Sequence, residues 1–258
     1  MPDILVTRNL SRSFGGLVAV DDFNLAVEKG ELIGLIGPNG AGKTTVFNLL
    51  TGLYKPTTGT IAFDGKDVTG FPPFRLAELG MARTFQNIRL FSNLTVFDNV
   101  LTACHGQAGY SIADAVFRTP RFRREHAELT KRADTLLEWV RLDTRKDEIA
   151  RNLPYGHQRR LEIARALALG PALLLLDEPA AGMNPKESAD LVEFILRIRR
   201  ELDLTILLIE HHMDIVMRIC ERVIVLNFGK TIAQGSPGEI QANPEVITAY
   251  LGEGEEIA

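Results

Sequence analysis

The sequence predicts an α/β fold, with a P-loop nucleotide-binding core on a mostly parallel sheet, an antiparallel β subdomain and an inserted helical subdomain. Three observations predict this fold class. A glycine-rich loop joins a strand pattern to a helix pattern, apolar strand patterns alternate with helical ones, and a long helical section interrupts them. Strands separated by helices indicate parallel crossovers, because parallel neighbours need a long connection.

The glycine-rich loop at residues 37–45 reads Gly-Pro-Asn-Gly-Ala-Gly-Lys-Thr-Thr and matches the P-loop pattern. An apolar run at 32–36 precedes it and a helical run at 46–50 follows it. Backbone N–H groups of such a loop surround phosphate, and the helix dipole favours the anion. We expect Lys43 to reach the β- and γ-phosphates and Thr44 to bind Mg²⁺. A glycine-rich turn without function is the alternative, which the flanking strand and helix disfavour.

Composition excludes several classes of protein. The 258 residues are 45% hydrophobic and 24% charged, which is ordinary for a globular chain, and the net charge of −4 provides no basic field for nucleic acid. Cys104 and Cys220 form no Cys-x-x-Cys pair and are expected to be buried or inert in a reducing cytosol. The first ten residues lack a signal-peptide pattern, and no apolar run approaches the roughly 20 residues of a membrane span. A membrane role would therefore come from a partner.

Strand-type alternation at residues 4–10, 16–27 and 60–63, with turns between, predicts the antiparallel β layer. Phe14 lies in a turn before the P-loop, where its ring could stack on adenine. Taken alone, a core or turn phenylalanine is the commoner interpretation.

Residues 71–80 favour a short helix, and Gln86 follows a β-like run. Amphipathic patterns at 96–104 and 121–142 indicate a mostly helical subdomain inserted into the core. A basic cluster on that subdomain is interpreted as a solvated face, with a lipid or permease contact as the alternative. Its members are Arg118, Arg121, Arg123 and Arg124.

The second half of a P-loop site follows. Four leucines at 173–176 predict a buried strand that ends in Asp177 and Glu178. We expect Asp177 to hold the Mg²⁺ shell and Glu178 to polarise the attacking water. A strand at 205–209 places His211 at the ligand-binding edge of the sheet. Zinc at the His-His pair is disfavoured, because no third ligand lies at a usable spacing. Leu-Pro-Tyr-Gly-His-Gln at 153–158 precedes a helix predicted at 159–169, a second anion site.

This ordered set of motifs resembles the ATP-binding cassette (ABC) ATPases over essentially the whole chain. The resemblance implies a head-to-tail dimer with each ATP between one P-loop and the facing signature motif, catalytic roles for Lys43, Glu178 and His211, and metal ligation by Thr44, Gln86 and Asp177. The nucleotide contacts it implies are Phe14, Val20, Asn39, Gly40, Ala41, Gly42, Lys43, Thr44, Thr45 and Gln86, with Tyr155, Gly156 and His157 of the facing subunit.

Within that family, the chain resembles the larger ATPase subunit of branched-chain amino-acid importers. The stretches that carry this likeness are 83–87, 118–124, 155–165, 177–182, 209–213 and the ending Tyr250-Leu-Gly-Glu. Two residues depart from the general family pattern, Pro154 at the signature serine and Asn184 at an aspartate, and the subfamily commonly carries similar changes. A glycolipid-export ATPase, a soluble non-transport ABC ATPase and a non-hydrolysing regulatory cassette are the alternatives.

The resemblance also implies how the chain is organised and placed. It implies one ABC ATPase domain, with an α/β core at 1–86 and 171–236, a helical signature subdomain at 87–170 and a helical tail at 237–258. The implied partners are membrane permease subunits, a second ATPase subunit, either identical or different, and indirectly an extracytoplasmic substrate-binding protein. The implied location is the cytoplasmic face of the inner or plasma membrane, with ATP and Mg²⁺ as cofactors.

Overall fold

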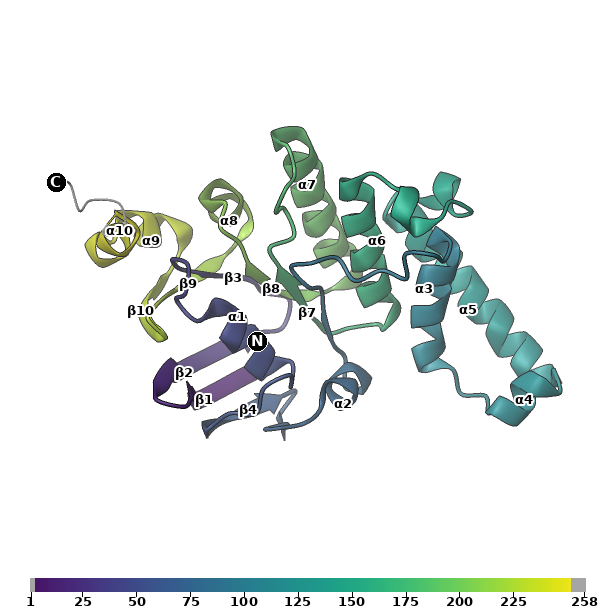
Figure 1. Ribbon diagram of the computed structural model, residues 1–258, viewed down its shortest axis with the longest axis horizontal. Helices are drawn as coiled ribbons and strands as arrows, with labels where there is room; N and C mark the ends of the chain where they lie inside the picture. The colour runs from purple at the N-terminus through teal and green to yellow at the C-terminus, as the bar shows by residue number, and fades with distance from the viewer. Residues whose placement is uncertain (1–2, 252–258) are drawn as a thin grey trace.

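The computed structural model describes residues 3–251 and is built on two sheets (Figure 1). The larger sheet has six strands in the order β10-β9-β3-β8-β7-β6. Every neighbouring pair in it is parallel except β9–β10. The strands are β3 (Leu32–Ile36), β6 (Met81–Arg83), β7 (Leu173–Asp177), β8 (Thr205–Ile209), β9 (Arg222–Asn227) and β10 (Lys230–Gly235). The central strands β3, β7 and β8 are buried throughout, which is why their sequences are continuous apolar runs.

The smaller sheet is antiparallel and has the order β2-β1-β4-β5. Its strands are β1 (Asp3–Phe14), β2 (Leu17–Glu28), β4 (Thr58–Phe63) and β5 (Lys66–Asp67). The phenylalanines at 23, 47 and 63 fill one hydrophobic core together with Ile33 and Leu35 of the P-loop strand. The antiparallel layer that the sequence predicts is confirmed.

The helices of the α/β core are α1 (Lys43–Leu50), α2 (Pro73–Glu78), α7 (Pro185–Leu202), α8 (Met213–Ile219), α9 (Pro237–Ala242) and α10 (Pro244–Leu251). Our sequence analysis did not identify α7. Its start is encoded locally, because the Asn184 side chain accepts from the backbone N–H of Glu187 while the Glu187 carboxylate accepts from that of Asn184. An asparagine can cap a helix as an aspartate does, so Asn184 keeps this structural role.

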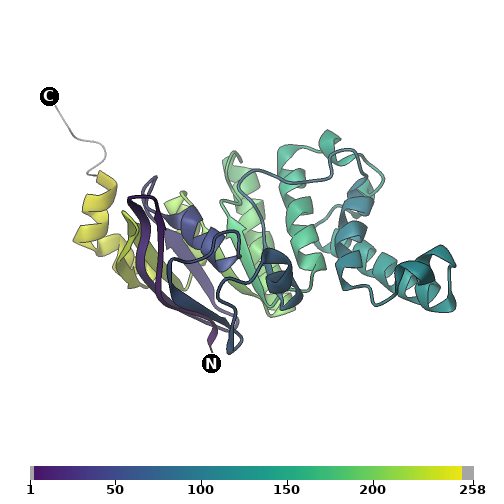
Figure 2. The same cartoon turned by 60° about the horizontal axis from the view of Figure 1, so that its bottom comes forward.

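The inserted section forms a helical lobe beside the sheets (Figures 1 and 2). It contains α3 (Val96–Cys104), α4 (Ile112–Val116), α5 (Pro120–Trp139), α6 (Tyr155–Ala168) and short 3₁₀ turns at His105–Gln107, Asp143–Arg145 and Ala150–Asn152. The apolar positions predicted for α5 are buried in the core. Helix α6 begins at Tyr155 rather than at 159, because the Pro154 carbonyl accepts the N–H groups of His157 and Gln158 and starts the helix there.

None of the helices in the described range combines the length and the apolar content that crossing a membrane requires. The Tyr250-Leu-Gly-Glu ending extends past residue 251, so its last two residues lie outside the described residues, as do the residues that follow them.

Candidate functional site

A cavity of about 550 Å³ opens where the P-loop, the end of β7 and the end of β8 meet. It is lined by Phe14, Leu17, Val18, Ala19, Asn39, Gly40, Ala41, Gly42, Lys43, Thr44, Thr45, Gln86, Glu178, His211, Phe228 and Gly229. Residues more than 190 positions apart in the chain therefore face one space. Among the residues expected to bind nucleotide within one subunit, the structure brings all but Val20 to this cavity.

The P-loop turns tightly between β3 and α1. Gly42 caps α1 in the left-handed region with φ 104°, and a Cβ built on it would lie 2.6 Å from the Ala19 carbonyl oxygen. The Lys43 side chain folds back over the loop, and its ammonium donates to the carbonyls of Gly37 at 2.6 Å and Pro38 at 2.8 Å. Lys43 is only 5% exposed. A buried cation and the N-terminus of α1 thus meet at one place, which suits a phosphate anion.

The carboxylate of Glu178 is held from two sides. Its Oε2 accepts a hydrogen bond from Gln86 Nε2 at 2.7 Å, and its Oε1 lies 2.5 Å from His211 Nε2. The Glu178 backbone is in the left-handed region with φ 46°, which is uncommon outside glycine, and its N–H donates to the Ile209 carbonyl on β8. The Glu178 residue lines the cavity in this conformation.

Asp177 occupies a different position from Glu178. Its Oδ2 pairs with Arg83 Nη2 at 2.8 Å, both side chains are buried, and Asp177 is absent from the residues that line the cavity in the described part of the chain. Burial raises the pKa of Asp177, and the hydrogen bond and charge of Arg83 oppose that rise. Thr44, Gln86 and Glu178 line the cavity. Their side chains carry hydroxyl, amide and carboxylate oxygens, and such hard oxygen ligands fit Mg²⁺.

The aromatic wall of the cavity differs in part from the expectation. Phe14 is 39% exposed, contacts Tyr54 edge-on at 5.3 Å between ring centroids, and has the Arg12 guanidinium 4.5 Å from its own centroid. The expectation for Val20 needs correction, because its side chain is 0% exposed in the core below the antiparallel sheet. Leu17 and Val18 line the cavity instead.

Tyr155, Gly156 and His157 lie on the first turn of α6, away from the cavity of their own chain. Tyr155 is half-exposed, and its ring lies 3.6 Å from the position a Cβ on Gly182 would take. Burial lowers the pKa of His157, and the neighbouring Arg145 and Arg160 lower it further. His157 Nδ1 is buried without a hydrogen-bond partner in the described structure.

Comparison with known proteins agrees with this geometry. The family model described as ABC transporter matches residues 20–181, and the model described as branched-chain amino acid ATP-binding cassette transporter matches residues 230–256. The chain belongs to the ABC transporter family. The cassette is an ATPase of the ABC type, and both the family and the ABC fold that the sequence predicts are confirmed.

The similar curated proteins cover nearly the whole cassette. BraF of Pseudomonas aeruginosa, a high-affinity branched-chain amino acid transport ATP-binding protein, is 48% identical over 97% of this chain and 98% of its own. LivG of Escherichia coli K12, with the same description, is 49% identical over the same shares. LptB of Haemophilus influenzae, a lipopolysaccharide export system ATP-binding protein, is 35% identical over the same shares.

Solved structures give the same family. A nucleotide-free ATP-binding cassette from an ABC transporter superposes with TM-score 0.83 at 32% identity, covering 96% of this chain and 98% of that one. The ADP conformation of an ATP-binding cassette of an ABC transporter superposes with TM-score 0.85, also at 32% identity, covering 98% and 100%.

The structure shows buried charged residues around the site that the sequence analysis missed. Glu210 is buried at 1% exposure and accepts from the N–H groups of Ala180 at 2.8 Å and His211 at 3.2 Å, so it joins the loop after Glu178 to the loop that carries His211. Arg83 holds Asp177, and Arg159 is completely buried on α6. Arg83 and Glu210 are charges at the end of an apolar run, which is the signal that could have marked them, since such charges are buried only when paired. Arg159 lies between Gln158 and Arg160, and no local pattern marks it as buried.

Proposed function

We propose that the cassette binds Mg-ATP in the cavity at the P-loop, forms a head-to-tail dimer around it, and hydrolyses it with water polarised by Glu178. The observation that carries the proposal is the convergence of Lys43, Glu178 and His211 on one cavity of nucleotide size. In the proposed complex the P-loop amides and the Lys43 ammonium bind the β- and γ-phosphates, and Phe14 contacts the adenine.

The Mg²⁺ site that we propose uses Thr44, Gln86 and Asp177. Thr44 and Gln86 face the cavity, while one Asp177 oxygen is paired with Arg83. Bound Mg²⁺ would neutralise charge on the β- and γ-phosphates during transfer. Asp177 would act on the metal shell with the oxygen that Arg83 does not bind.

In the proposed hydrolytic step, Glu178 is the general base. The carboxylate takes the proton of a water that attacks the γ-phosphorus, the bond to the leaving β-phosphate oxygen breaks, and ADP and phosphate are the products. His211 would contact the γ-phosphate and hold Glu178. The N-terminal turn of α6, where Tyr155 is exposed and Gly156 and His157 are half-buried, supports the proposal that these three residues bind the γ-phosphate of the facing subunit.

We propose that the cassette energises the uptake of branched-chain or other hydrophobic amino acids. The printed names of BraF and LivG, both near 49% identity, support this substrate class over lipopolysaccharide export, since LptB is 35% identical. The proposed partners are membrane permease subunits at the cytoplasmic face, a second ATPase subunit and, indirectly, an extracytoplasmic binding protein.

The decisive experiment measures Mg²⁺-dependent phosphate release by the purified cassette against protein concentration, beside Glu178→Gln. We expect a rate per subunit that rises with concentration, and a loss of about 10²–10⁴-fold in the variant while ATP binding survives. Equal rates in the two proteins would refute Glu178 as the base. When the cassette is co-expressed with the permease genes, we expect ATP-dependent leucine uptake. Lipopolysaccharide export in place of leucine uptake would favour the LptB-like alternative.

A further inference from the structure

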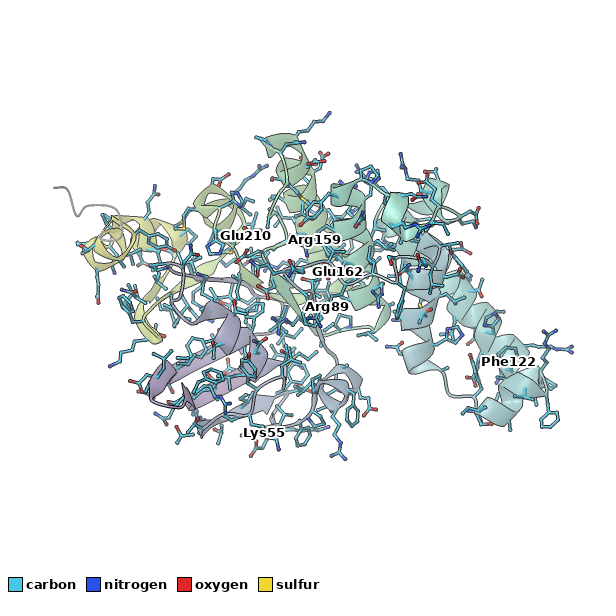
Figure 3. The ribbon with its side chains drawn as sticks, viewed as in Figure 1. Lys55, Arg89, Phe122, Arg159, Glu162 and Glu210 are labelled. Carbon is cyan, nitrogen blue, oxygen red and sulfur yellow. The ribbon has the colours of Figure 1, made fainter. Side chains whose placement is uncertain are left out.

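The segment that carries Gln86 leaves the parallel sheet abruptly. Thr84 N still donates to the Leu175 carbonyl of β7 at 2.9 Å. From Phe85 to Arg89, several backbone groups of the segment form hydrogen bonds with side chains of α6 instead. Figure 3 shows Arg159 and Glu162 of α6 near Arg89 at the centre of the molecule.

Arg159 holds the two carbonyls at the start of the segment. Its Nη1 donates to the Phe85 carbonyl at 2.7 Å, and its Nη2 donates to the Gln86 carbonyl at 2.8 Å. The side chain of Arg159 is 0% exposed, so its charge has been removed from water entirely. A buried guanidinium of this kind must be paired, and its fork geometry suits two adjacent acceptors.

Glu162 completes the contact with the amides of the same segment. Its Oε2 accepts from Arg159 Nη1 at 2.7 Å, and its Oε1 accepts from the N–H groups of Phe85 and Arg89, each at 3.3 Å. The Glu162 side chain is 6% exposed. The pair Arg159–Glu162 therefore binds two N–H groups and two carbonyls of residues 85–89.

Two further contacts attach the segment to the helical lobe. Arg165, also on α6, donates to the Arg89 carbonyl, and its guanidinium lies 4.6 Å from the centroid of Phe91. Asn99 of α3 bonds the N–H of Phe91 at 2.9 Å and its carbonyl at 3.0 Å. Residues 85–91 thus have polar partners on both α6 and α3.

We propose that Arg159 and Glu162 are positioning residues that fasten residues 85–89 to α6, so that this segment moves with the helical lobe and not with the parallel sheet. The lobe then begins at Phe85, two residues earlier than the boundary expected from the sequence. The pair is well suited to this role, because it satisfies backbone groups that an apolar contact could not bind.

The consequence concerns Glu178, and this part rests on the proposed function. The Gln86 carbonyl accepts a hydrogen bond from Arg159 of α6, while the Gln86 side-chain amide donates to Glu178, which follows β7. A displacement of α6 relative to the sheet would therefore lengthen or break the bond from Gln86 to the candidate base. The position of the signature helix would set how Glu178 is held within the same subunit.

The first test needs no nucleotide, so it is independent of the proposed function. The double variant Arg159→Met/Glu162→Leu removes both charges and leaves no lone buried ion. The matched control, Arg121→Met/Glu125→Leu, removes an exposed arginine–glutamate pair on α5. Backbone hydrogen exchange is measured residue by residue in the nucleotide-free cassette.

We expect the amides of Phe85 and Arg89 to exchange at least about tenfold faster in the Arg159/Glu162 variant and at the original rate in the control. Unchanged exchange at both amides would overturn the proposal. If the double variant fails to fold, Glu162→Gln, which keeps the shape of the side chain, should raise the two rates about fivefold. No rise in that variant would likewise overturn it.

The second test measures whether residues 85–89 move with the helical lobe or with the sheets. Spin labels are placed at Asn87 and at either Lys131 on α5 or Thr60 on β4, all exposed positions. Strand β4 reports on the sheets, because Ile61 and Phe63 share one core with Ile33 and Leu35 of β3 in the parallel sheet. The natural cysteines stay in place, because burial raises the pKa of both thiols and leaves them poorly reactive. We expect a narrower distance distribution for 87–131 than for 87–60, and broadening of 87–131 in the double variant. A narrower 87–60 distribution in the unmodified cassette would refute the proposal.

Discussion

The Nε2 atom of His211 lies 2.5 Å from the Oε1 atom of Glu178, although 33 positions and the whole of α7 separate the two residues. The contact forms because β7 and β8 are adjacent parallel strands, with Asp177 opposite Ile209, so their C-terminal ends present side chains to the same edge. Gln86 holds the other oxygen of Glu178 at 2.7 Å. The candidate base is thus held by two groups before any water reaches it.

His211→Ala removes one of these groups and the proposed γ-phosphate contact. We expect phosphate release to fall by roughly 10²-fold, with a much smaller change in ATP binding, because the P-loop contacts remain. The matched control is His212→Ala, which alters a half-exposed neighbour that contacts Glu210. Comparable losses of kcat in the two variants would contradict the role given to His211.

Pro154→Ser places a hydroxyl at the N-cap of the signature helix α6. Pro154 is the N-cap of α6 and makes no side-chain cap. A hydrogen bond to a charged group contributes about 1.5–3 kcal/mol, so we expect ATP-driven dimerisation of the Glu178→Gln background to tighten by roughly ten- to a hundredfold. Analytical ultracentrifugation with ATP measures the effect. Pro154→Ala is the control, and an equal gain there would mean that loss of the ring, not the new hydroxyl, is responsible.

The stability of the cassette should depend on pH through His157. Burial is the main cause that lowers the pKa of His157 below its usual 6.5, so the folded state disfavours the charged ring. The unfolded chain then binds the proton first as pH falls, and the free energy of unfolding decreases as pH drops through 6.5 toward the folded pKa.

Urea unfolding at pH 7.5 and 5.5 measures this dependence. His157→Gln, which cannot be protonated, should lose less stability between the two values than the unmodified cassette. An unaltered pH dependence in His157→Gln would disprove the assignment.

Two P-loop glycines should respond differently to the same substitution. A Cβ on Gly37 would lie 2.1 Å from the Leu226 carbonyl oxygen, whereas one on Gly40 meets nothing within 4 Å. Both have positive φ, so Gly40→Ala should cost only the left-handed strain of about 1–2 kcal/mol. Gly37→Ala must also displace the backbone of β9 and should cost clearly more. Urea unfolding compares the two, and equal losses would show that the loop relaxes freely.

Local patterns were sufficient for much of the fold. The leucines of β7 and the apolar positions of α5 are buried as predicted, because periodicity reports directly which face a helix or strand buries. Strand β10 was missed, since its residues are half-buried or exposed at a sheet edge and carry a weak pattern. The start of α7 was readable from Asn184 and Glu187 but was not used.

The candidate site was predictable to the extent that it is built from continuous motifs. Gln86 lines the cavity, as do residues 39–45 of the P-loop, which include Lys43 and Thr44. Val20 was misplaced, because the pairing of β1 with β2 decides which residues of β2 reach the cavity. The pairing of Arg83 with Asp177 joins positions that no local pattern connects.

By itself the sequence determined the fold class, the P-loop, the acidic strand end and the family of this cassette, because each is encoded in neighbouring residues whose types carry the chemistry. Only the tertiary structure decided that Arg159 and Glu162 bind the segment around Gln86, and that Gln86 and His211 share Glu178. These contacts join residues 33 to 92 positions apart. Their partners are chosen by strand order and by the packing of α6 against that segment, and the physical reason is that a buried charge must find its counterpart in three dimensions.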